Sequence, residues 1–122
     1  MGTAETVGQS LMRKKEGSYR DASGAGLIIR PLEPEDLPEI LDIERQGYSH
    51  PWTEGIFLDC FKPSYRLWGA CQGGSLIGYV VVSYVLDEVQ LLNLCVHPGY
   101  RGLGAGRFLL RHLRTEAARE SM

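Results

Sequence analysis

Apolar residues along this chain fall into two patterns, short β-rich runs and stripes at helical spacing. The runs hold β-branched and aromatic residues bounded by turn signals, which is typical of strands, and they cover residues 27–32, 65–72, 75–86 and 88–96. Stripes that recur at steps of three or four predict helices within residues 33–49, 53–62 and 105–120. The predicted element order is therefore β-α-α-β-β-β-α.

Turn and cap residues support these boundaries. Pro34 and the acidic residues around it suit a helix start, and Thr53 suits an N-cap. Gly73-Gly74 predicts a hairpin, and the strand that follows is near enough to be its antiparallel neighbour. The three stripes consist of Leu37, Ile40, Leu41 and Tyr48; Ile56, Phe57, Cys60 and Phe61; and Ala105, Leu109, Leu113 and Ala117.

The chain has 122 residues, which suits one domain. Residues 1–26 are polar and rich in Gly and Ser, so we expect a flexible tail before a domain at residues 27–122. The tail lacks the apolar centre of a secretory signal, and no run approaches the roughly 20 apolar residues of a membrane helix, which favours a cytoplasmic protein. The net charge of −2 gives no general case for binding nucleic acid or membranes.

Three cysteines, Cys60, Cys71 and Cys95, are scattered in apolar contexts without a CxxC pair or metal-ligand spacing. We interpret them as buried thiols and expect no metal site. No cysteine has a suitably placed histidine in the local sequence, so cysteine catalysis is not expected.

The segment from Gly99 to Gly106 carries most of the functional information. Four glycines lie within eight residues, between a predicted strand and a predicted helix, with Arg101 and Arg107 among them. A strand that enters a helix through glycines leaves backbone N–H groups available to an anion, and the helix dipole and the arginines add positive charge. A tight turn with surface arginines explains the glycines equally well.

Two phosphate-binding motifs fail in this segment. Gly99 and Gly104 have the separation of a Walker A loop, but Ala105 stands where that motif needs lysine. Gly102 and Gly104 begin a dinucleotide fingerprint, but Arg107 takes the third glycine position, and the preceding strands look antiparallel. A nucleotide-binding protein is therefore not favoured.

A third pattern fits. The stretch "RGLGAG", Arg101 to Gly106, resembles the [Q/R]-x-x-G-x-[G/A] motif of the GNAT acyl-CoA N-acyltransferase superfamily. Val96-His97-Pro98 is similar to the "V-x-P" end of that family's fourth strand, and Tyr100-Arg101 to its "Y-[R/Q]" pair. The order of elements also matches the family's N-terminal portion. The resemblance implies an α/β (α+β) fold, with a mixed, mainly antiparallel sheet and flanking helices.

Two further stretches resemble one branch of the superfamily, the ribosomal-protein alanine N-acetyltransferases (the RimI type). "HPWTEGIF" is similar to the branch's "PW-[ST]-E" segment, and "LDEVQLLNLCVHPGY" to its "LDE…N-[IL]-x-V-x-P-x-Y" strand. This resemblance implies acetyl-CoA as co-substrate and a protein N-terminal α-amine, such as that of a ribosomal protein, as acceptor.

The resemblance also implies where acetyl-CoA binds. Its pyrophosphate would lie on the loop and helix start that follow Arg101, formed by Gly102, Leu103, Gly104, Ala105, Gly106 and Arg107. Its pantetheine arm would pair, like an added strand, with the backbone of Leu94, Cys95 and Val96. A deprotonated amine then attacks the thioester carbonyl, a base or water relay removes the proton, and a general acid, often tyrosine, meets the leaving thiolate.

The chain departs from the family after its last predicted helix. The family continues with a fifth strand, a helix and two more strands, and in the ribosomal-protein branch the base and the acid tyrosine lie there, so the catalytic residues are unassigned here. The strand at residues 88–96 would keep an exposed edge that favours self-association. The alternative to an N-acetyltransferase is a truncated, catalytically inactive acyl-CoA-binding or protein-interaction module.

Polar residues on and beside the predicted strands have simpler interpretations. Asp87-Glu88 fits a hairpin turn better than a catalytic base. Asn93 fits a contact with the substrate amine and a satisfied strand edge equally well. His97, before Pro98, fits the capped end of a strand.

The last predicted helix carries three arginines and a histidine. Arg107 is expected to contact phosphate, whereas Arg111 and Arg114 are expected on a solvated face. His112 lies among these arginines and is expected to be solvated.

Overall fold

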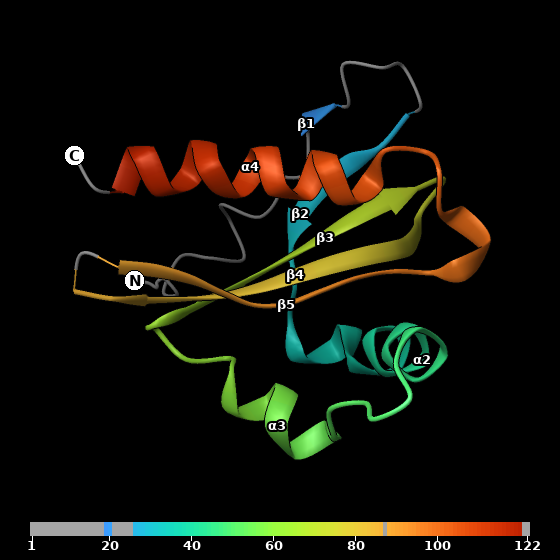
Figure 1. The fold of residues 1–122 in the computed structure, drawn as a ribbon, viewed down its shortest axis with the longest axis horizontal. Coiled ribbons are helices and arrows are strands. Elements are labelled where there is room, and N and C mark those ends of the chain that lie inside the picture. Colours follow the sequence, from blue (N-terminus) through green and yellow to red (C-terminus); the bar gives the residue numbers. More distant parts are fainter. Residues whose placement is uncertain (1–18, 21–25, 87, 121–122) are drawn as a thin grey trace.

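A computed structural model (Figure 1) describes residues 19–20, 26–86 and 88–120. The strands are β1 (Tyr19–Arg20), β2 (Ile28–Pro31), β3 (Tyr65–Gln72), β4 (Ser75–Val85) and β5 (Glu88–Val96). The helices are α2 (Leu37–Gly47), α3 (Glu54–Asp59) and α4 (Ala105–Glu120), with 3-10 turns η1 (Pro34–Asp36) and η2 (Pro98–Tyr100). From β2 onward the order β-α-α-β-β-β-α is confirmed.

The strands form one sheet in the order β1-β2-β3-β4-β5, and every neighbouring pair is antiparallel. The predicted hairpin is confirmed, because Gly73 and Gly74 adopt positive φ angles of 59° and 87° that favour glycine. The short strand β1 falls in the expected tail and pairs Tyr19 with Ile29, while the rest of residues 1–25 lies outside the described residues. None of the described helices is long and apolar enough to cross a membrane.

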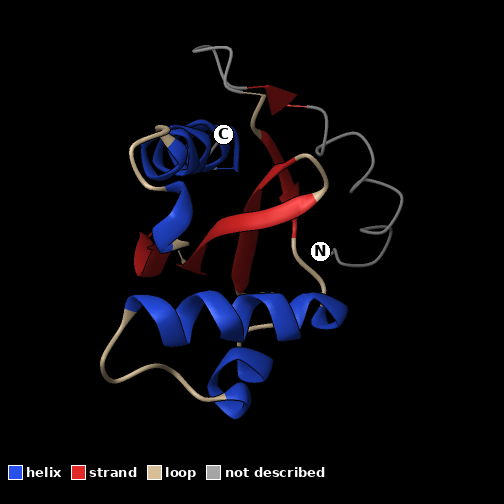
Figure 2. Ribbon diagram, turned by 90° about the vertical axis from the view of Figure 1, so that its right-hand side faces the viewer, coloured by secondary structure: helices blue, strands red, loops and turns tan. Residues whose placement is uncertain are grey.

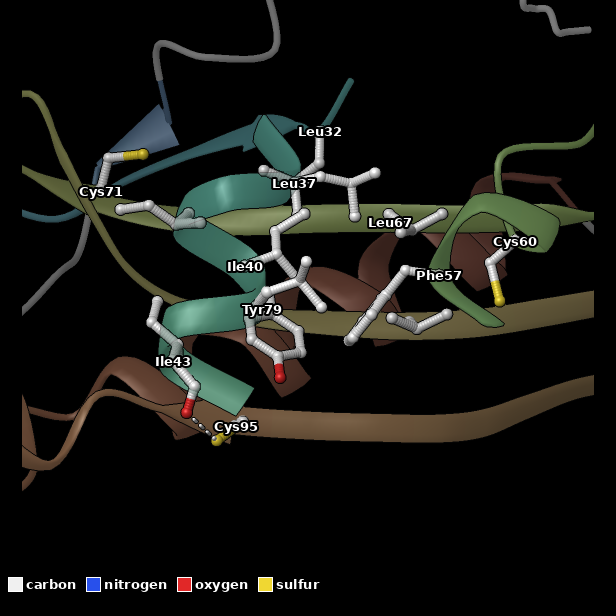
Figure 3. Packing of buried hydrophobic residues seen from close by; sticks show 13 residues of the cluster. Leu32, Leu37, Ile40, Ile43, Phe57, Cys60, Leu67, Cys71, Tyr79 and Cys95 are labelled. Atoms are coloured by element: carbon white, nitrogen blue, oxygen red, sulfur yellow. Dashed lines mark hydrogen bonds between the residues drawn. The ribbon is translucent and has the colours of Figure 1, made fainter. Parts of the chain in front are cut away.

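Helices cover both faces of the sheet (Figures 1 and 2). Helix α4 packs on one face, where the buried cluster includes Ile29, Trp68, Val80 and Leu109. Helices α2 and α3 cover the other face, where Ile40, Phe57 and Tyr79 belong to the second cluster (Figure 3). The fold class expected from the sequence is therefore confirmed: a three-layer α+β structure with an antiparallel sheet at its centre.

The apolar stripe of α2 is confirmed for Leu37, Ile40 and Leu41, which are buried. It is wrong for Tyr48, whose side chain is 41% exposed. The helix ends at Gly47, and Tyr48 has an extended backbone with φ −133° and ψ 142°. The chain therefore leaves the helical spiral one residue before the stripe would continue, and Glu44 occupies a buried position instead.

The expectation that His112 is solvated is wrong. Helix α4 lies over β3, and the His112 ring packs edge-on against Trp68 with the ring centroids 4.7 Å apart. The residue is 6% exposed. Burial lowers the pKa of His112 to about 4, and the positive charge of Arg119 acts in the same direction. Arg111 and Arg114 are exposed, as expected.

Candidate functional site

The glycine segment forms the turn between β5 and α4. Gly102 and Gly104 have φ angles of 87° and 86°, a backbone conformation that side chains with a Cβ rarely adopt. A Cβ at either position would meet no heavy atom within 4 Å, so the space above the turn is open. Helix α4 begins directly afterwards at Ala105, and the first N–H groups of a helix have no intrahelical acceptor. These features fit an anion site. A turn that served only to connect β5 to α4 would not need open space above its glycines.

A cavity of about 520 Å³ lies over this turn. It is lined by Val96, Tyr100, Arg101, Gly102, Leu103, Gly104, Ala105, Gly106, Arg107 and Arg111. Eight of the ten positions implied by the resemblance are thus brought together, namely Val96 and the seven residues from Arg101 to Arg107. Arg111, which sequence reasoning assigned to a solvated face, also lines the cavity one helical turn after Arg107. Three guanidinium groups and a helix N-terminus make this cavity suited to a phosphate group.

The open edge of the sheet leads away from this cavity. Strand β5 is the last strand in the sheet order. Just after it, His97 N donates to Ile77 O of the neighbouring strand β4 at 2.7 Å. The carbonyls of Leu94 and Val96 instead accept hydrogen bonds from side chains outside the sheet. Tyr48 Oη donates to Leu94 O at 2.5 Å, and Arg101 Nε donates to Val96 O at 3.3 Å. Leu94 and Val96 therefore present backbone groups to the open side.

Cys95 lies between these two residues and faces the interior. Its backbone is paired with Tyr79, and its thiol contacts Ile43 O at 3.7 Å (Figure 3). Burial raises the pKa of Cys95, and the carboxylate of Glu44 raises it further. All three cysteines are free and buried, which confirms their interpretation as buried thiols. No group of three or more metal-ligating side chains is found in the described part of the chain.

A second cavity, of about 420 Å³, adjoins the middle of β5. It is lined by Glu44, Tyr48, His50, Trp52, Leu91, Leu92, Asn93 and Leu94. The strand is irregular here, because Asn93 opposes Val81 while Leu91 opposes Val82, which leaves Leu92 as an extra residue in a bulge. A bulge bends the strand locally, and this one lies beside the cavity.

Glu44 is the functional candidate that sequence reasoning missed. The residue is 1% exposed, and its carboxylate accepts hydrogen bonds from the Tyr79 hydroxyl, from Asn93 Nδ2 at 3.0 Å and from Trp52 N at 2.9 Å. No ion pair found among the described residues includes Glu44. The available signal was its position four residues after Ile40, because an acidic residue on an apolar stripe is uncommon.

The amide of Asn93 is satisfied within the protein, and its contact with a substrate amine stays a prediction. Asn93 is buried, donates to Glu44 and lines the second cavity, so its amide orients the carboxylate on the cavity floor. His97 caps η2 as expected, since its Nδ1 accepts from Gly99 N at 2.9 Å. Asp87 lies outside the described residues, and Glu88 is exposed at the start of β5.

Comparisons with known proteins bear on this site. Residues 29–122 match the acetyltransferase (GNAT) family. The [ribosomal protein bS18]-alanine N-acetyltransferase of Escherichia coli K12 is 36% identical over 88 residues, which cover 72% of this chain and 60% of that protein. The Haemophilus influenzae protein of the same name is 31% identical over 86 residues, covering 70% and 59%.

A solved structure agrees with these relatives. The ribosomal-protein-S18-alanine N-acetyltransferase from Escherichia coli superposes with a TM-score of 0.75 at 34% identity, over 77% of this chain and 61% of that chain. The present chain thus spans about 60% of the length of the curated relatives it matches.

Proposed function

The chain belongs to the acetyltransferase (GNAT) family, and on this premise we propose that it transfers an acetyl group from acetyl-CoA to the α-amine of a protein N-terminus. The observation that carries the proposal is the open edge of β5 between two cavities, one lined by arginines and the other by a buried carboxylate. A donor and an acceptor can therefore approach the same edge from opposite ends.

The donor half of the site binds acetyl-CoA in this proposal. The residues from Gly102 to Arg107 bind the pyrophosphate through backbone N–H groups, and Arg101, Arg107 and Arg111 add positive charge. The outward N–H groups of Leu94 and Val96 donate to the carbonyls of the pantetheine arm, as an edge strand does to an added strand, while their carbonyls keep the hydrogen bonds from Tyr48 and Arg101. Cys95 contributes by holding the strand in the sheet, because its own backbone pairs with Tyr79.

The acceptor half of the site is the cavity that contains Glu44. A buried carboxylate without a paired Lys or Arg favours a cation at its open side, and an N-terminal ammonium group supplies one. The bound thioester supplies the electrophilic carbon, and Glu44 and Asn93 orient the amine beside it. The names of the relatives support alanine of a ribosomal protein as the acceptor, which would place the reaction in the cytoplasm.

The test measures acetyl-CoA binding and acetyl transfer with the same three proteins: wild type, Gly104→Glu and Gly55→Glu. Titration calorimetry reports binding, and mass spectrometry reports transfer to a peptide with N-terminal alanine, with the N-acetylated peptide as the blocked control. Gly104→Glu places a carboxylate and a strained left-handed residue in the phosphate cavity. Gly55→Glu adds the same charge on exposed α3, where a Cβ meets only Thr53 Oγ1 at 3.9 Å.

We expect saturable binding by wild type and Gly55→Glu, and at least a tenfold loss in Gly104→Glu. Transfer to the free but not the blocked peptide would support the acceptor assignment. A folded wild-type chain that binds no acetyl-CoA would exclude the proposed function. Binding without transfer would favour the acyl-CoA-binding module instead.

A further inference from the structure

His97 joins the end of β5 to the short turn η2, which leads into the arginine-lined cavity. Its backbone is tied to the sheet, since His97 N donates to Ile77 O at 2.7 Å, and its carbonyl accepts from Tyr100 N at 2.9 Å. Its side chain caps the turn, because Nδ1 accepts from Gly99 N at 2.9 Å. His97 therefore holds η2 through both its backbone and its side chain.

The imidazole ring is kept in this orientation by its neighbours. The Tyr100 ring meets it edge-on with the ring centroids 5.4 Å apart, and a Cβ added at Gly99 would lie only 3.3 Å from Nδ1. On the side of α2, the Gln46 amide nitrogen lies 3.4 Å from Nε2 and donates to the Asp42 carboxylate. The titratable and charged groups on the elements around the ring are thus Tyr100, Asp42 and, directly after η2, Arg101.

The cap depends on the charge of the ring. A ring nitrogen that accepts a hydrogen bond carries no hydrogen, so the bond from Gly99 N requires the neutral imidazole with its hydrogen on Nε2. Histidine is the side chain that ordinarily changes its charge between pH 5 and 8. A protonated ring would turn an N–H group toward the N–H of Gly99, and the cap would give way to repulsion.

We propose that His97 is a positioning residue of the acetyl-CoA site and makes acetyl-CoA binding weaken as the pH falls. The inference rests on the proposed function, in which Arg101 and the glycine turn bind the pyrophosphate. The neutral ring holds η2 and so keeps Arg101 at the cavity, where its Nε donates to Val96 O at 3.3 Å. Protonation of His97 releases η2, and Arg101 leaves the arrangement that binds phosphate.

The experiment measures acetyl-CoA binding by titration calorimetry at pH 7.5 and pH 5.5 for wild type, His97→Asn and His97→Ala. Asparagine is a preferred N-cap that does not titrate, and its side-chain oxygen is as many bonds from the backbone as Nδ1. His97→Asn should bind like wild type at pH 7.5 and about fivefold more tightly than wild type at pH 5.5. His97→Ala, which has no cap, should bind about fivefold more weakly than wild type at pH 7.5 and like wild type at pH 5.5.

Two other effects of low pH are controlled. The phosphates of acetyl-CoA also take up protons in this range, but they do so alike for every variant, so the ratio of affinities between variants isolates His97. His112→Gln removes a histidine that packs under α4 away from η2, and it should show the pH dependence of wild type. Circular dichroism shows that each protein is folded at both pH values.

Equal affinities of wild type and His97→Asn at both pH values would overturn the assignment and leave the proposed function intact. Wild-type affinity of His97→Ala at pH 7.5 would also overturn it, because the cap would then not position the site. The same holds if His112→Gln abolishes the pH dependence. A folded wild-type chain that binds no acetyl-CoA would remove the proposed function and this inference together.

Discussion

At the scale of single residues, two buried polar side chains, Glu44 and His112, have consequences for the site and for stability. Glu44 is satisfied by three donors from three separate segments, and it supplies an anion to the floor of a cavity. His112 packs against Trp68 under α4. A buried side chain of this kind couples stability to its protonation state, since only the neutral imidazole suits an apolar contact.

We predict that His112 makes the protein less stable as the pH falls. Its pKa is about 4 in the folded chain, whereas the ordinary pKa of a solvated histidine, which applies to the unfolded chain, is 6.5. Because the folded value is lower, stability is complete above pH 6.5 and is lost as the unfolded chain takes up a proton between pH 6.5 and 4. The loss should reach roughly 2 kcal/mol between pH 7.5 and pH 5.

Urea denaturation of wild type and His112→Gln at both pH values measures this effect. Each variant gives a change in the free energy of unfolding between the two pH values. The difference between these two changes isolates His112 from the carboxyl groups that titrate in the same range. Equal changes would show that His112 does not remain neutral in the folded protein.

At the scale of elements, the cavity that contains Glu44 depends on the close approach of α2 to β5. Gly47, the last residue of α2, has no Cβ, and a Cβ there would lie 2.4 Å from Cys95 Sγ. The close packing brings Tyr48, the next residue, onto the edge carbonyl of Leu94. The small residue at position 47 is therefore a packing requirement for the site.

We predict that Gly47→Ala lowers the free energy of unfolding by about 1–3 kcal/mol, because the added methyl group overlaps the Cys95 sulfur. Cys95→Ala removes that sulfur, so the double variant should recover part of the loss. Gly55→Ala is the matched control, since its Cβ has an ordinary contact of 3.9 Å, and it should be neutral or stabilising. Strictly additive effects of Gly47→Ala and Cys95→Ala in urea denaturation would contradict this packing.

At the scale of the whole molecule, the described sheet ends at β5 with an open edge. Apolar side chains gather along its hairpin and are exposed, namely Val85, Leu86, Val89, Leu91 and Leu92. Unpaired backbone beside apolar side chains favours pairing with another strand. Self-association through this edge is therefore part of what we propose for this chain.

We predict that the chain self-associates at rising concentration and that Val89→Lys weakens this association at least tenfold, since a charge on an edge strand opposes pairing. Sedimentation velocity over a concentration series measures the effect. Ile56→Lys, at an exposed position on α3, is the control and should behave as wild type. A wild-type chain that remains monomeric throughout would refute the prediction.

Local sequence patterns were enough to predict the elements, their order, the hairpin and the glycine turn. These features depend on residues close together in the chain, such as the pair Gly73-Gly74 and the positive φ angles at Gly102 and Gly104. The N-cap at Thr53 is local in the same way, because its hydroxyl accepts from Ile56 N three residues later.

The cavity that contains Glu44 could not be predicted from the sequence, because it is built from contacts between distant segments. Glu44 meets Tyr79 and Asn93 across separations of 35 and 49 residues, and Tyr48 meets Leu94 across 46. His112 is buried because α4 lies over Trp68, not because of its neighbours along the helix. Contacts between distant segments depend on how α2 and α4 pack on the sheet, and that packing has no signature in any single stretch of residues.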